Sequence, residues 1–307
     1  MTGPSGRRGR DFGKRRNFLR ENLLYLKEVE KRLRKKKVRS APSEAESLLR
    51  HFGKMSRLDF FTGEKPIPPK ARKAVQKALQ ERVKGAPLSY LMKKAEFFGH
   101  VFYVSKDTLI PRPETEILVQ ETLKILDRFY PPVFSSPKIL DVGTGSGCVA
   151  LSLTIKRPDS RMTALDISPR ALSVVRKNME FHGLRKKIKC VESDLFSFFG
   201  EKEKSHWDVI VSNPPYVPAE DFPTLSKEVL SEPRIALDGG SRGLRIILAL
   251  LEKAPYFLKK EGWLLLEIGK GHSQALAKRL LKGGVFNNFC FVKDPAGIER
   301  VLIARKK

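Results

Sequence analysis

Glycines and acidic residues follow several apolar segments of this chain, at the points where those segments are expected to end as β-strands. Gly143, Gly145 and Gly147 come directly after the segment that ends in Asp141 and Val142. Glycines there permit a tight turn and let the backbone approach a ligand closely. The GxGxG spacing differs from the GxGxxG of dinucleotide-binding loops, and no Gly-Lys-Ser/Thr of a phosphate-binding loop follows. The loop by itself indicates either a ligand site or a plain turn, and it disfavours hydride and phosphoryl transfer.

Acidic residues at the next two segment ends could hold the parts of a nucleoside. Asp166 follows Asp141 at close to the spacing at which dinucleotide folds place an acid on the ribose hydroxyls. Asp194 could accept a hydrogen bond from an adenine amino group, and Leu195 could pack against the ring. Asp166 could instead cap the helix expected after Pro169. Chance is a poorer explanation for three such strand ends, the glycine loop, Asp166 and Asp194, than for any one of them.

The order of the apolar segments predicts the elements that must position these residues. Strands are expected at 138–142, 162–167, 188–191, 209–211, 263–268, 289–292 and 301–304, and helices at 113–129, 148–155, 169–182, 244–258 and 273–281. Successive βα units require a parallel sheet with right-handed crossovers, whereas the last two strands are joined by a short turn and must be antiparallel. We therefore predict a Rossmann-like, doubly wound α/β sheet with an antiparallel terminal strand, which binds ligands at its carboxyl strand ends.

Three further segments precede the predicted sheet domain at 111–307. Residues 1–17 are basic and contain few large apolar side chains, which predicts a disordered arm. Apolar residues then repeat at helical spacing over 18–84, which predicts a small helical domain. A β-rich stretch around Gly99 predicts a β-hairpin within a linker at 85–110. The arm could contact RNA nonspecifically or serve only as a solubilising tail.

Composition restricts the class of protein. The 307 residues include 60 Lys and Arg against 34 Asp and Glu, and the resulting net charge of +26 favours phosphate-containing partners. No apolar run approaches the roughly 18–20 residues of a membrane span. Three widely separated cysteines indicate reduced thiols rather than disulfides or a zinc site, and the histidines have no metal-ligand spacing. We expect a cytoplasmic, monomeric protein that binds neither a metal nor a membrane.

The segment Asn213-Pro214-Pro215-Tyr216 resembles the loop after the fourth strand in methyltransferases that modify amino groups with S-adenosylmethionine. A planar amide or aromatic amine is a poor nucleophile because its lone pair is delocalised. The side-chain oxygen of Asn213 and the carbonyl of Pro214 can accept both N–H bonds, which aligns the nitrogen and stabilises its developing charge. The two prolines stiffen the loop, and Tyr216 can stack on the planar group.

Further motifs narrow this resemblance, and the chain is identified as a member of the protein-(glutamine-N5) methyltransferases. The motifs are GAPLSYL at 85–91, AEFFG at 95–99, LIPRPETE at 109–116, SEPRIALDGG at 231–240 and LEIG at 266–269. Within the family the chain is most similar to members that act on peptide chain release factors. The resemblance implies methyl transfer from S-adenosylmethionine to the side-chain amide N5 of the glutamine in the Gly-Gly-Gln loop of class 1 release factors. The helical domain and the hairpin would contact that protein.

The resemblance also implies roles for residues at matching positions. S-adenosylmethionine would be bound by Gly143, Thr144, Gly145, Ser146, Gly147, Asp166, Asp194 and Leu195, with Asn213 near the methyl donor. The substrate amide would be held by Asn213, Pro214, Pro215 and Tyr216, of which Asn213, Pro214 and Tyr216 would be catalytic. Arg112 and Glu114 would border the site or only pin the linker to the sheet. No residue is indicated as a general base.

The chain departs from the family pattern at two positions, and two other substrate classes stay open. Lys93 stands where the hairpin usually has Gly, and Arg242 stands where an acidic residue usually follows Gly-Gly-x. The substrate could be a glutamine of a ribosomal protein. An amine methyltransferase acting on RNA or DNA bases would also suit the loop and the charge, although no separate nucleic-acid module is apparent. Intact Gly143, Asp166 and Asn213 argue against a non-catalytic RNA-binding protein.

Overall fold

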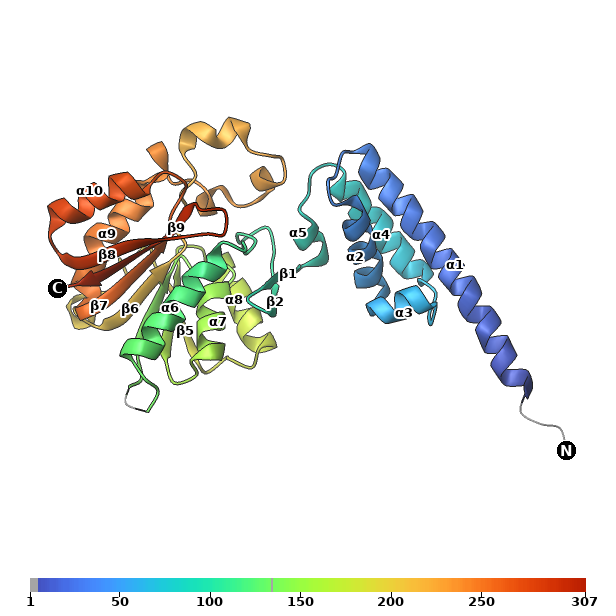
Figure 1. Ribbon diagram of the computed structural model, residues 1–307, viewed down its shortest axis with the longest axis horizontal. Coiled ribbons are helices and arrows are strands. Elements are labelled where there is room, and N and C mark those ends of the chain that lie inside the picture. The colour runs from blue at the N-terminus through green and yellow to red at the C-terminus, as the bar shows by residue number, and fades with distance from the viewer. Residues whose placement is uncertain (1–4, 134) are drawn as a thin grey trace. The chain divides into compact units, whose positions relative to one another are not determined.

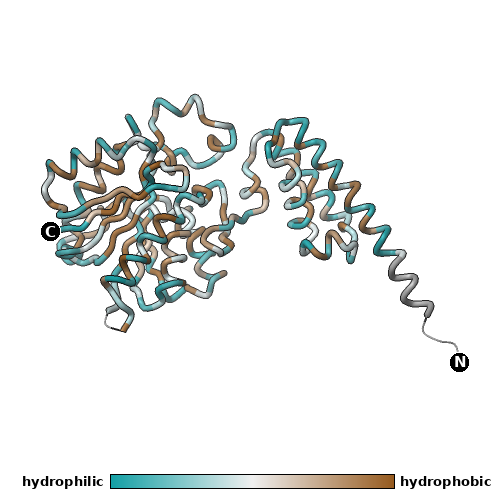
Figure 2. Tube along the Cα trace, in the orientation of Figure 1, coloured by the Kyte–Doolittle hydropathy of each residue, from teal (hydrophilic) through white to brown (hydrophobic). Residues whose placement is uncertain are grey.

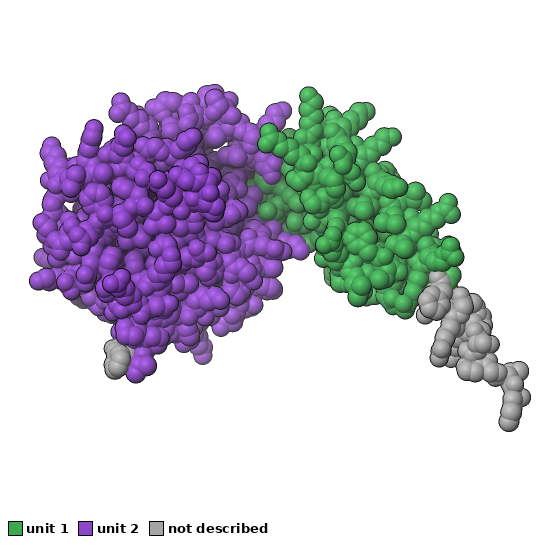
Figure 3. Space-filling view, viewed as in Figure 1, with its two compact units in different colours: residues 1–92 green, residues 93–307 purple. Residues whose placement is uncertain are grey.

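A computed structural model of the chain describes the backbone of residues 5–133 and 135–307, with side chains from residue 13 onward. This part of the chain forms two compact units that divide between Met92 and Lys93 (Figure 3). Each unit has a hydrophobic core of its own. No helix within the described residues has both the length and the apolar character that crossing a membrane requires.

Helices make up most of the first unit. They are α1 (Ser5–Lys35), α2 (Ala41–Gly53), α3 (Arg57–Thr62), α4 (Pro69–Arg82) and α5 (Leu88–Met92). Their apolar faces meet in a core that includes Leu33, Leu49 and Leu79. The buried Asn22 of α1 donates a hydrogen bond to the carbonyl of Lys65 (3.0 Å) and accepts one from the N–H of Ile67 (3.2 Å). This amide therefore fixes the segment between α3 and α4 against α1.

The basic segment at 1–17 differs from its prediction as a disordered arm. Helix α1 begins at Ser5, so the segment is helical from that residue onward, and residues 1–4 lie outside the described part of the chain. Arg and Lys have high helix propensities, and extending a helix that already exists costs much less than nucleating one. The packed turns of α1 supply that nucleus, which composition alone did not reveal.

The second unit is built on one mixed sheet (Figure 1). Its strands run in the order β5-β4-β3-β6-β7-β9-β8. They are β3 (Lys138–Val142), β4 (Arg161–Asp166), β5 (Ile188–Glu192), β6 (Trp207–Ser212), β7 (Leu258–Glu267), β8 (Phe286–Lys293) and β9 (Glu299–Lys306). Strands β3 to β7 pair in parallel, and β9 is antiparallel to both β7 and β8. The prediction of a doubly wound sheet with an antiparallel terminal strand is confirmed.

Helices cover both faces of this sheet. Helices α6 (Thr115–Phe129), α7 (Cys148–Lys156) and α8 (Pro169–Phe181) enclose one core, and α9 (Arg245–Phe257) and α10 (Ser273–Gly283) enclose the other. Successive strand residues face opposite sides, so Ile139 belongs to the first core and Leu140 to the second. Both faces are buried, and hydrophobic residues therefore run continuously along the central strands (Figure 2).

The predicted hairpin lies in the second unit and is bonded to its helices. It comprises β1 (Lys94–Phe97) and β2 (His100–Tyr103), joined by two residues with positive φ. Glu116 of α6 accepts a hydrogen bond from the turn N–H of Phe98 (2.8 Å). The fully buried Asn178 of α8 accepts from the N–H of Tyr103 (2.7 Å), and its amide donates to the carbonyls of Tyr103 (3.0 Å) and Ser146 (2.8 Å). One amide thus joins the hairpin, α8 and the glycine loop.

Candidate active site

A cavity of about 590 Å³ lies at the carboxyl ends of β3, β4, β5 and β6. Strand order reverses between β3 and β6, which is where doubly wound sheets bind ligands. Its lining includes the predicted residues Gly143, Thr144, Gly145, Ser146, Asp166, Asp194, Leu195, Asn213, Pro214 and Pro215. Gly147 and Tyr216, also predicted, do not line it.

The three glycines of the loop after β3 have different roles. All three have positive φ, at 71° for Gly143, 58° for Gly145 and 82° for Gly147. A Cβ at Gly147 would lie 2.7 Å from a methyl group of Leu151, a residue of α7. Glycine at this position therefore allows the chain to enter α7 without a clash. No atom would lie within 4 Å of a Cβ at Gly143 or Gly145. Open space for a ligand therefore exists beside these two glycines.

Two buried aspartates hold the glycine loop. Asp141 accepts a hydrogen bond from the Thr144 hydroxyl (2.7 Å), and burial raises the pKa of Asp141 to about 7. Asp166 accepts the N–H of Gly145 (2.8 Å) and the N–H of Ser168 (2.9 Å), and burial raises its pKa as well. The cap of α8 is Ser168, so helix capping does not account for Asp166. Because a carboxylate can accept about four hydrogen bonds, Asp166 can still bind hydroxyls in the cavity.

The end of β5 presents an acid and an apolar side chain. The Asp194 carboxylate is exposed and has no hydrogen bond or ion pair within the described residues. Leu195 has a left-handed backbone, with φ at 50°, and packs partly against the core under α9. This geometry places an unused acceptor beside an apolar surface, as recognition of an adenine edge and face requires.

Asn213 is bound on one side only. Its amide N–H donates to the hydroxyl oxygen of Thr115, the first residue of α6 (3.0 Å). The Thr115 hydroxyl in turn interacts with the buried carboxylate of Glu267 and lowers its pKa. Thr115 therefore acts as the acceptor for the Asn213 amide N–H. The side-chain oxygen of Asn213 has no partner within the described residues and stays available as an acceptor.

Tyr216 is anchored in the structure through its hydroxyl group. Its hydroxyl donates to Glu267 (3.0 Å), a fully buried residue at the end of β7. Burial raises the pKa of Glu267 to about 7. Burial and then the Glu267 carboxylate raise the pKa of Tyr216, so the phenol stays protonated and donates. Thr115 thus holds the Asn-Pro-Pro-Tyr loop at its Asn213 end, and Glu267 holds it at its Tyr216 end.

Sequence reasoning missed Thr115, Glu267 and Glu232 as site-building residues. Glu232 accepts the N–H of Ile110 (3.0 Å) and pairs with Arg112. Arg112 does not line the cavity, so it pins its segment, whereas its neighbour Pro111 does line it. An acid at the end of an otherwise apolar strand, such as Glu267, was the available signal, because a buried carboxylate needs a partner.

The cavity is acidic in a strongly basic protein. Its lining contains Asp107, Asp141, Asp166, Asp194 and Asp238 against Arg234 and Arg245. Asp238 is neutralised by Arg234, which donates to it at 3.1 Å. Asp107 lies 4.0 Å from Arg170, and burial raises the pKa of both Asp141 and Asp166, so the exposed and unpaired Asp194 is the clearest negative charge of the lining. A positively charged ligand would relieve the penalty of ionising the two buried carboxyl groups.

Curated relatives place the chain in a family. It is 37% identical over 271 residues to the release factor glutamine methyltransferase of Chlorobaculum tepidum, covering 87% of this chain and 91% of that protein. It is 35% identical to the protein of the same description from Geobacter sulfurreducens, with 89% and 92% covered. The chain belongs to the release factor glutamine methyltransferase family. Family profiles agree, since the PrmC N-terminal domain matches residues 25–92 and the methyltransferase small domain matches residues 115–249.

Solved structures support the fold of this family member. The catalytic domain of hMettl16 in complex with MAT2A 3'UTR hairpin 6 gives a TM-score of 0.54 at 16% identity, over 74% of this chain and 81% of that one. A human methyltransferase 10 domain containing protein gives 0.51 at 18% identity, over 75% and 96%. At these identities the likeness concerns the fold alone.

Proposed function

We propose that the protein methylates the side-chain amide N5 of the glutamine in the Gly-Gly-Gln loop of class 1 peptide chain release factors, with S-adenosylmethionine as donor. The observation that carries this proposal is the unpartnered oxygen of Asn213 at the edge of an acidic cavity, in a chain of this family. The helical unit and the hairpin contact the release factor, and the enzyme acts as a cytoplasmic monomer.

The cavity residues fit S-adenosylmethionine. Space beside Gly143 and Gly145 admits the amino acid part, Asp166 accepts from the ribose, and Asp194 with Leu195 holds the adenine. The acidic lining matches the positive sulfonium. When bound, this cofactor supplies the methyl group.

The Asn-Pro-Pro-Tyr loop holds the glutamine amide. The oxygen of Asn213 and the carbonyl of Pro214 accept its two N–H bonds, which orients the nitrogen and stabilises the positive charge that develops on it. Thr115 accepts the N–H of Asn213, which leaves the Asn213 oxygen free for the substrate. No His or Lys belongs to the cavity lining within the described residues, and we assign no general base; the amide proton leaves to water.

Labelled methyl transfer tests the substrate assignment. The full-length protein is given labelled S-adenosylmethionine with a class 1 release factor, with the same factor carrying Gln→Ala in its Gly-Gly-Gln loop, or with total RNA. Label on the release factor that disappears with the Gln→Ala substitution is expected. Label on RNA alone would overturn the proposal.

Two variants test the division of roles. Asn213→Ala should lower kcat by about 100-fold or more, because the amide loses an acceptor used in the transition state, while the cofactor Kd stays near the wild-type value. Asp166→Ala should weaken cofactor binding by about tenfold or more, because a hydrogen bond to a charged group is lost. Asn287→Ala, at an exposed position of β8, is the control. Normal turnover by Asn213→Ala would contradict the amide clamp.

A further inference from the structure

A second hollow of about 720 Å³ lies at the amino ends of the strands, opposite to the carboxyl ends that carry the cavity. It is formed where β3, β4, β5 and β6 begin, together with the segment between α8 and β5. Its lining includes Lys138, Arg161, Arg185, Lys186, Lys187, Lys189, Phe199, Glu203, His206 and Trp207. We call this hollow the basic groove. The proposed methyl transfer uses none of these residues.

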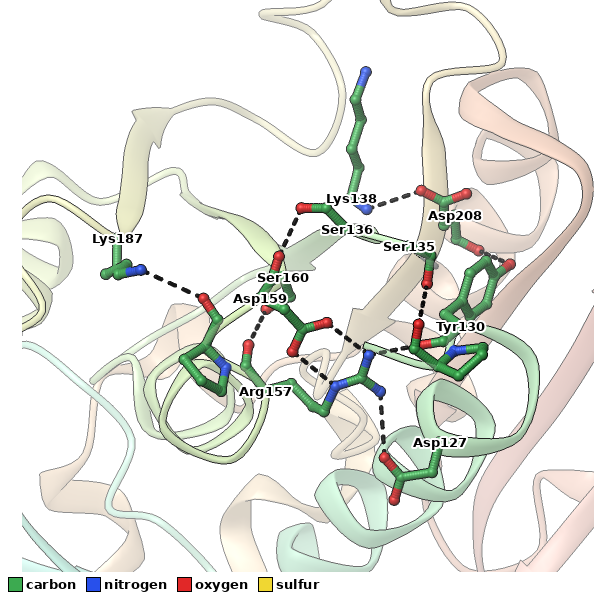
Figure 4. Close-up of polar contacts among 12 residues, drawn as sticks. Asp127, Tyr130, Ser135, Ser136, Lys138, Arg157, Asp159, Ser160, Lys187 and Asp208 are labelled. Carbon is green, nitrogen blue, oxygen red and sulfur yellow. Dashed lines mark hydrogen bonds and ion pairs between the residues drawn. The ribbon is translucent and has the colours of Figure 1, made fainter. Parts of the chain in front are cut away.

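Two of the carboxylates in and under the basic groove, Asp159 and Asp208, are neutralised from within the protein. Arg157, which is buried, donates to Asp159 with two hydrogen bonds of 2.9 and 2.7 Å and lowers the pKa of Asp159 (Figure 4). Asp208 accepts the backbone N–H of Lys138 (2.8 Å) and pairs with Lys259 (2.7 Å). Glu203 accepts the backbone N–H of Gly200 (3.1 Å) and forms no ion pair within the described residues, so its single carboxylate stands against the six Lys and Arg side chains of the lining.

Those cations are mostly unpaired. Arg161, Lys186 and Lys189 are exposed and form no ion pair within the described residues. The side chain of Lys138 extends away from the contacts made by its backbone (Figure 4). Arg185 pairs with Glu180, but both side chains are more than 60% exposed, so water screens this attraction strongly. The groove therefore attracts anions.

Aromatic side chains lie among these cations. The His206 ring meets Trp207 edge-on, with the ring centroids 4.9 Å apart. Burial and then Lys138 lower the pKa of His206, so its ring is uncharged at neutral pH. The indole N–H of Trp207 is buried and has no hydrogen-bond partner within the described residues. Trp207 is buried, so the partly exposed His206 is the ring of this pair that a base can reach. A flat ring beside unpaired cations is the combination by which proteins bind single-stranded nucleic acid.

We propose that the basic groove binds the phosphodiester backbone of single-stranded RNA, with a base stacked against His206. Each nucleotide supplies one negative charge and one flat ring, which matches the groove, whereas an acidic peptide has no ring to stack. The groove and the cavity lie at opposite ends of the same strands. RNA in the groove therefore leaves the cavity open, and the protein can bind RNA while it methylates a protein substrate.

Binding of a fluorescent 16-nucleotide oligouridine to the full-length protein, measured by anisotropy between 50 and 300 mM salt, tests this site. Arg161→Gln, Lys186→Gln and Lys189→Gln together should weaken binding by about 10- to 100-fold and make the slope of log K against log salt shallower by about 2. Lys270→Gln, Lys278→Gln and Lys282→Gln together remove the same charge from exposed positions outside the groove and should change the affinity by less than about threefold.

Two further arms complete the test. His206→Ala should weaken RNA binding by at least about fivefold, because a stacking surface is lost. Methyl transfer by the groove variants should stay at the wild-type rate, which separates this proposal from the proposed function. Equal losses in the two triple variants would mean that net charge alone binds RNA and would overturn the site. Displacement of the RNA by an equal charge concentration of oligoglutamate would overturn the choice of ligand.

Discussion

Asn213 depends on a neighbour that is far away in the sequence. The hydroxyl oxygen of Thr115, 98 positions upstream, accepts a hydrogen bond from the Asn213 N–H. The carboxylate of Glu267, 51 positions downstream of Tyr216, accepts one from the Tyr216 hydroxyl. A terminal amide can rotate by 180° at little cost, which would exchange its acceptor and donor at the substrate. In this structure the Thr115 oxygen accepts the Asn213 N–H, and this hydrogen bond stabilises the orientation in which the amide oxygen of Asn213 is free for the substrate.

Thr115→Val tests this positioning role. Val has nearly the shape of Thr but offers no acceptor, so the Asn213 amide loses its fixed orientation, and kcat should fall by about 10- to 100-fold. The cofactor Kd and the KM for the release factor should change much less. Thr115→Ser keeps the hydroxyl and should restore most of kcat. Steady-state kinetics with calorimetric cofactor titration decide, and an unchanged kcat in Thr115→Val contradicts the role.

Glu267 should make stability depend on pH. The pKa of Glu267 in the folded protein is about 7, above the ordinary value of 4.5. Below pH 4.5 the carboxyl group is protonated in both the folded and the unfolded chain, so it does not destabilise the fold. Between pH 4.5 and 7 it ionises in the unfolded chain first, and the free energy of unfolding falls as the pH rises. Relative to Glu267→Gln, the free energy of unfolding of the wild type should therefore fall by up to about 3 kcal/mol over this range. Urea unfolding at pH 5, 6, 7 and 8 measures it. Asp141 titrates in both proteins and cancels, so a constant difference would contradict the assignment.

At the scale of elements, both departures from the family pattern occur where the backbone is left-handed. Lys93 precedes the hairpin with φ at 54°, and Arg242 lies inside the short 3₁₀ segment Ser241–Gly243 with φ at 55°. Glycine adopts this conformation freely, and Asp tolerates it better than longer side chains do. The left-handed backbone therefore gives a local physical reason why Lys93 and Arg242 are strained at these two positions.

Lys93→Gly should stabilise the second unit. Removing the Cβ relieves about 1–2 kcal/mol of strain in the left-handed backbone. The greater freedom of glycine in the unfolded chain offsets about half of this gain, so the free energy of unfolding should rise by about 0.5–1 kcal/mol. Lys94→Gly, one residue later inside β1, should lower it instead. Tryptophan fluorescence during urea unfolding reports both variants, and a decrease for Lys93→Gly would contradict the strain argument.

At the scale of the whole molecule, the two units have separate cores and separate ion pairs. Glu44 and Arg82 in the first unit form two hydrogen bonds of 2.6 and 2.9 Å, with each side chain only 8% exposed. Removing one partner of a buried pair leaves the other charge without compensation. Both tryptophans of the chain, Trp207 and Trp263, belong to the second unit.

Glu44→Gln should therefore destabilise only the first unit. We expect a loss of about 3 kcal/mol in that unit, because the Arg82 charge stays buried. Far-UV circular dichroism should show a shifted helical transition, while the tryptophan transition stays in place. Equal shifts of both signals would show that the chain unfolds as one cooperative body and would contradict independent units.

The sequence by itself determined the parallel sheet, its terminal antiparallel strand, the glycine turn and the strand-end residues of the cavity. These features depend on short-range patterns, since strand and helix periodicity and turn residues act over a few positions. The helical start of α1 was missed because helix extension depends on a nucleus that packing supplies.

The side chains that hold the site in place became evident only from the packed fold. Thr115 with Asn213, Tyr216 with Glu267, and Ile110 with Glu232 are 98, 51 and 122 positions apart, and the alternation of apolar residues carries no information about such pairs. Likewise, the unpaired cations of the basic groove form one site only because the fold brings the amino ends of four strands side by side. Hydrogen bonds and charge balance depend on distances of a few ångströms, and the packed fold sets those distances.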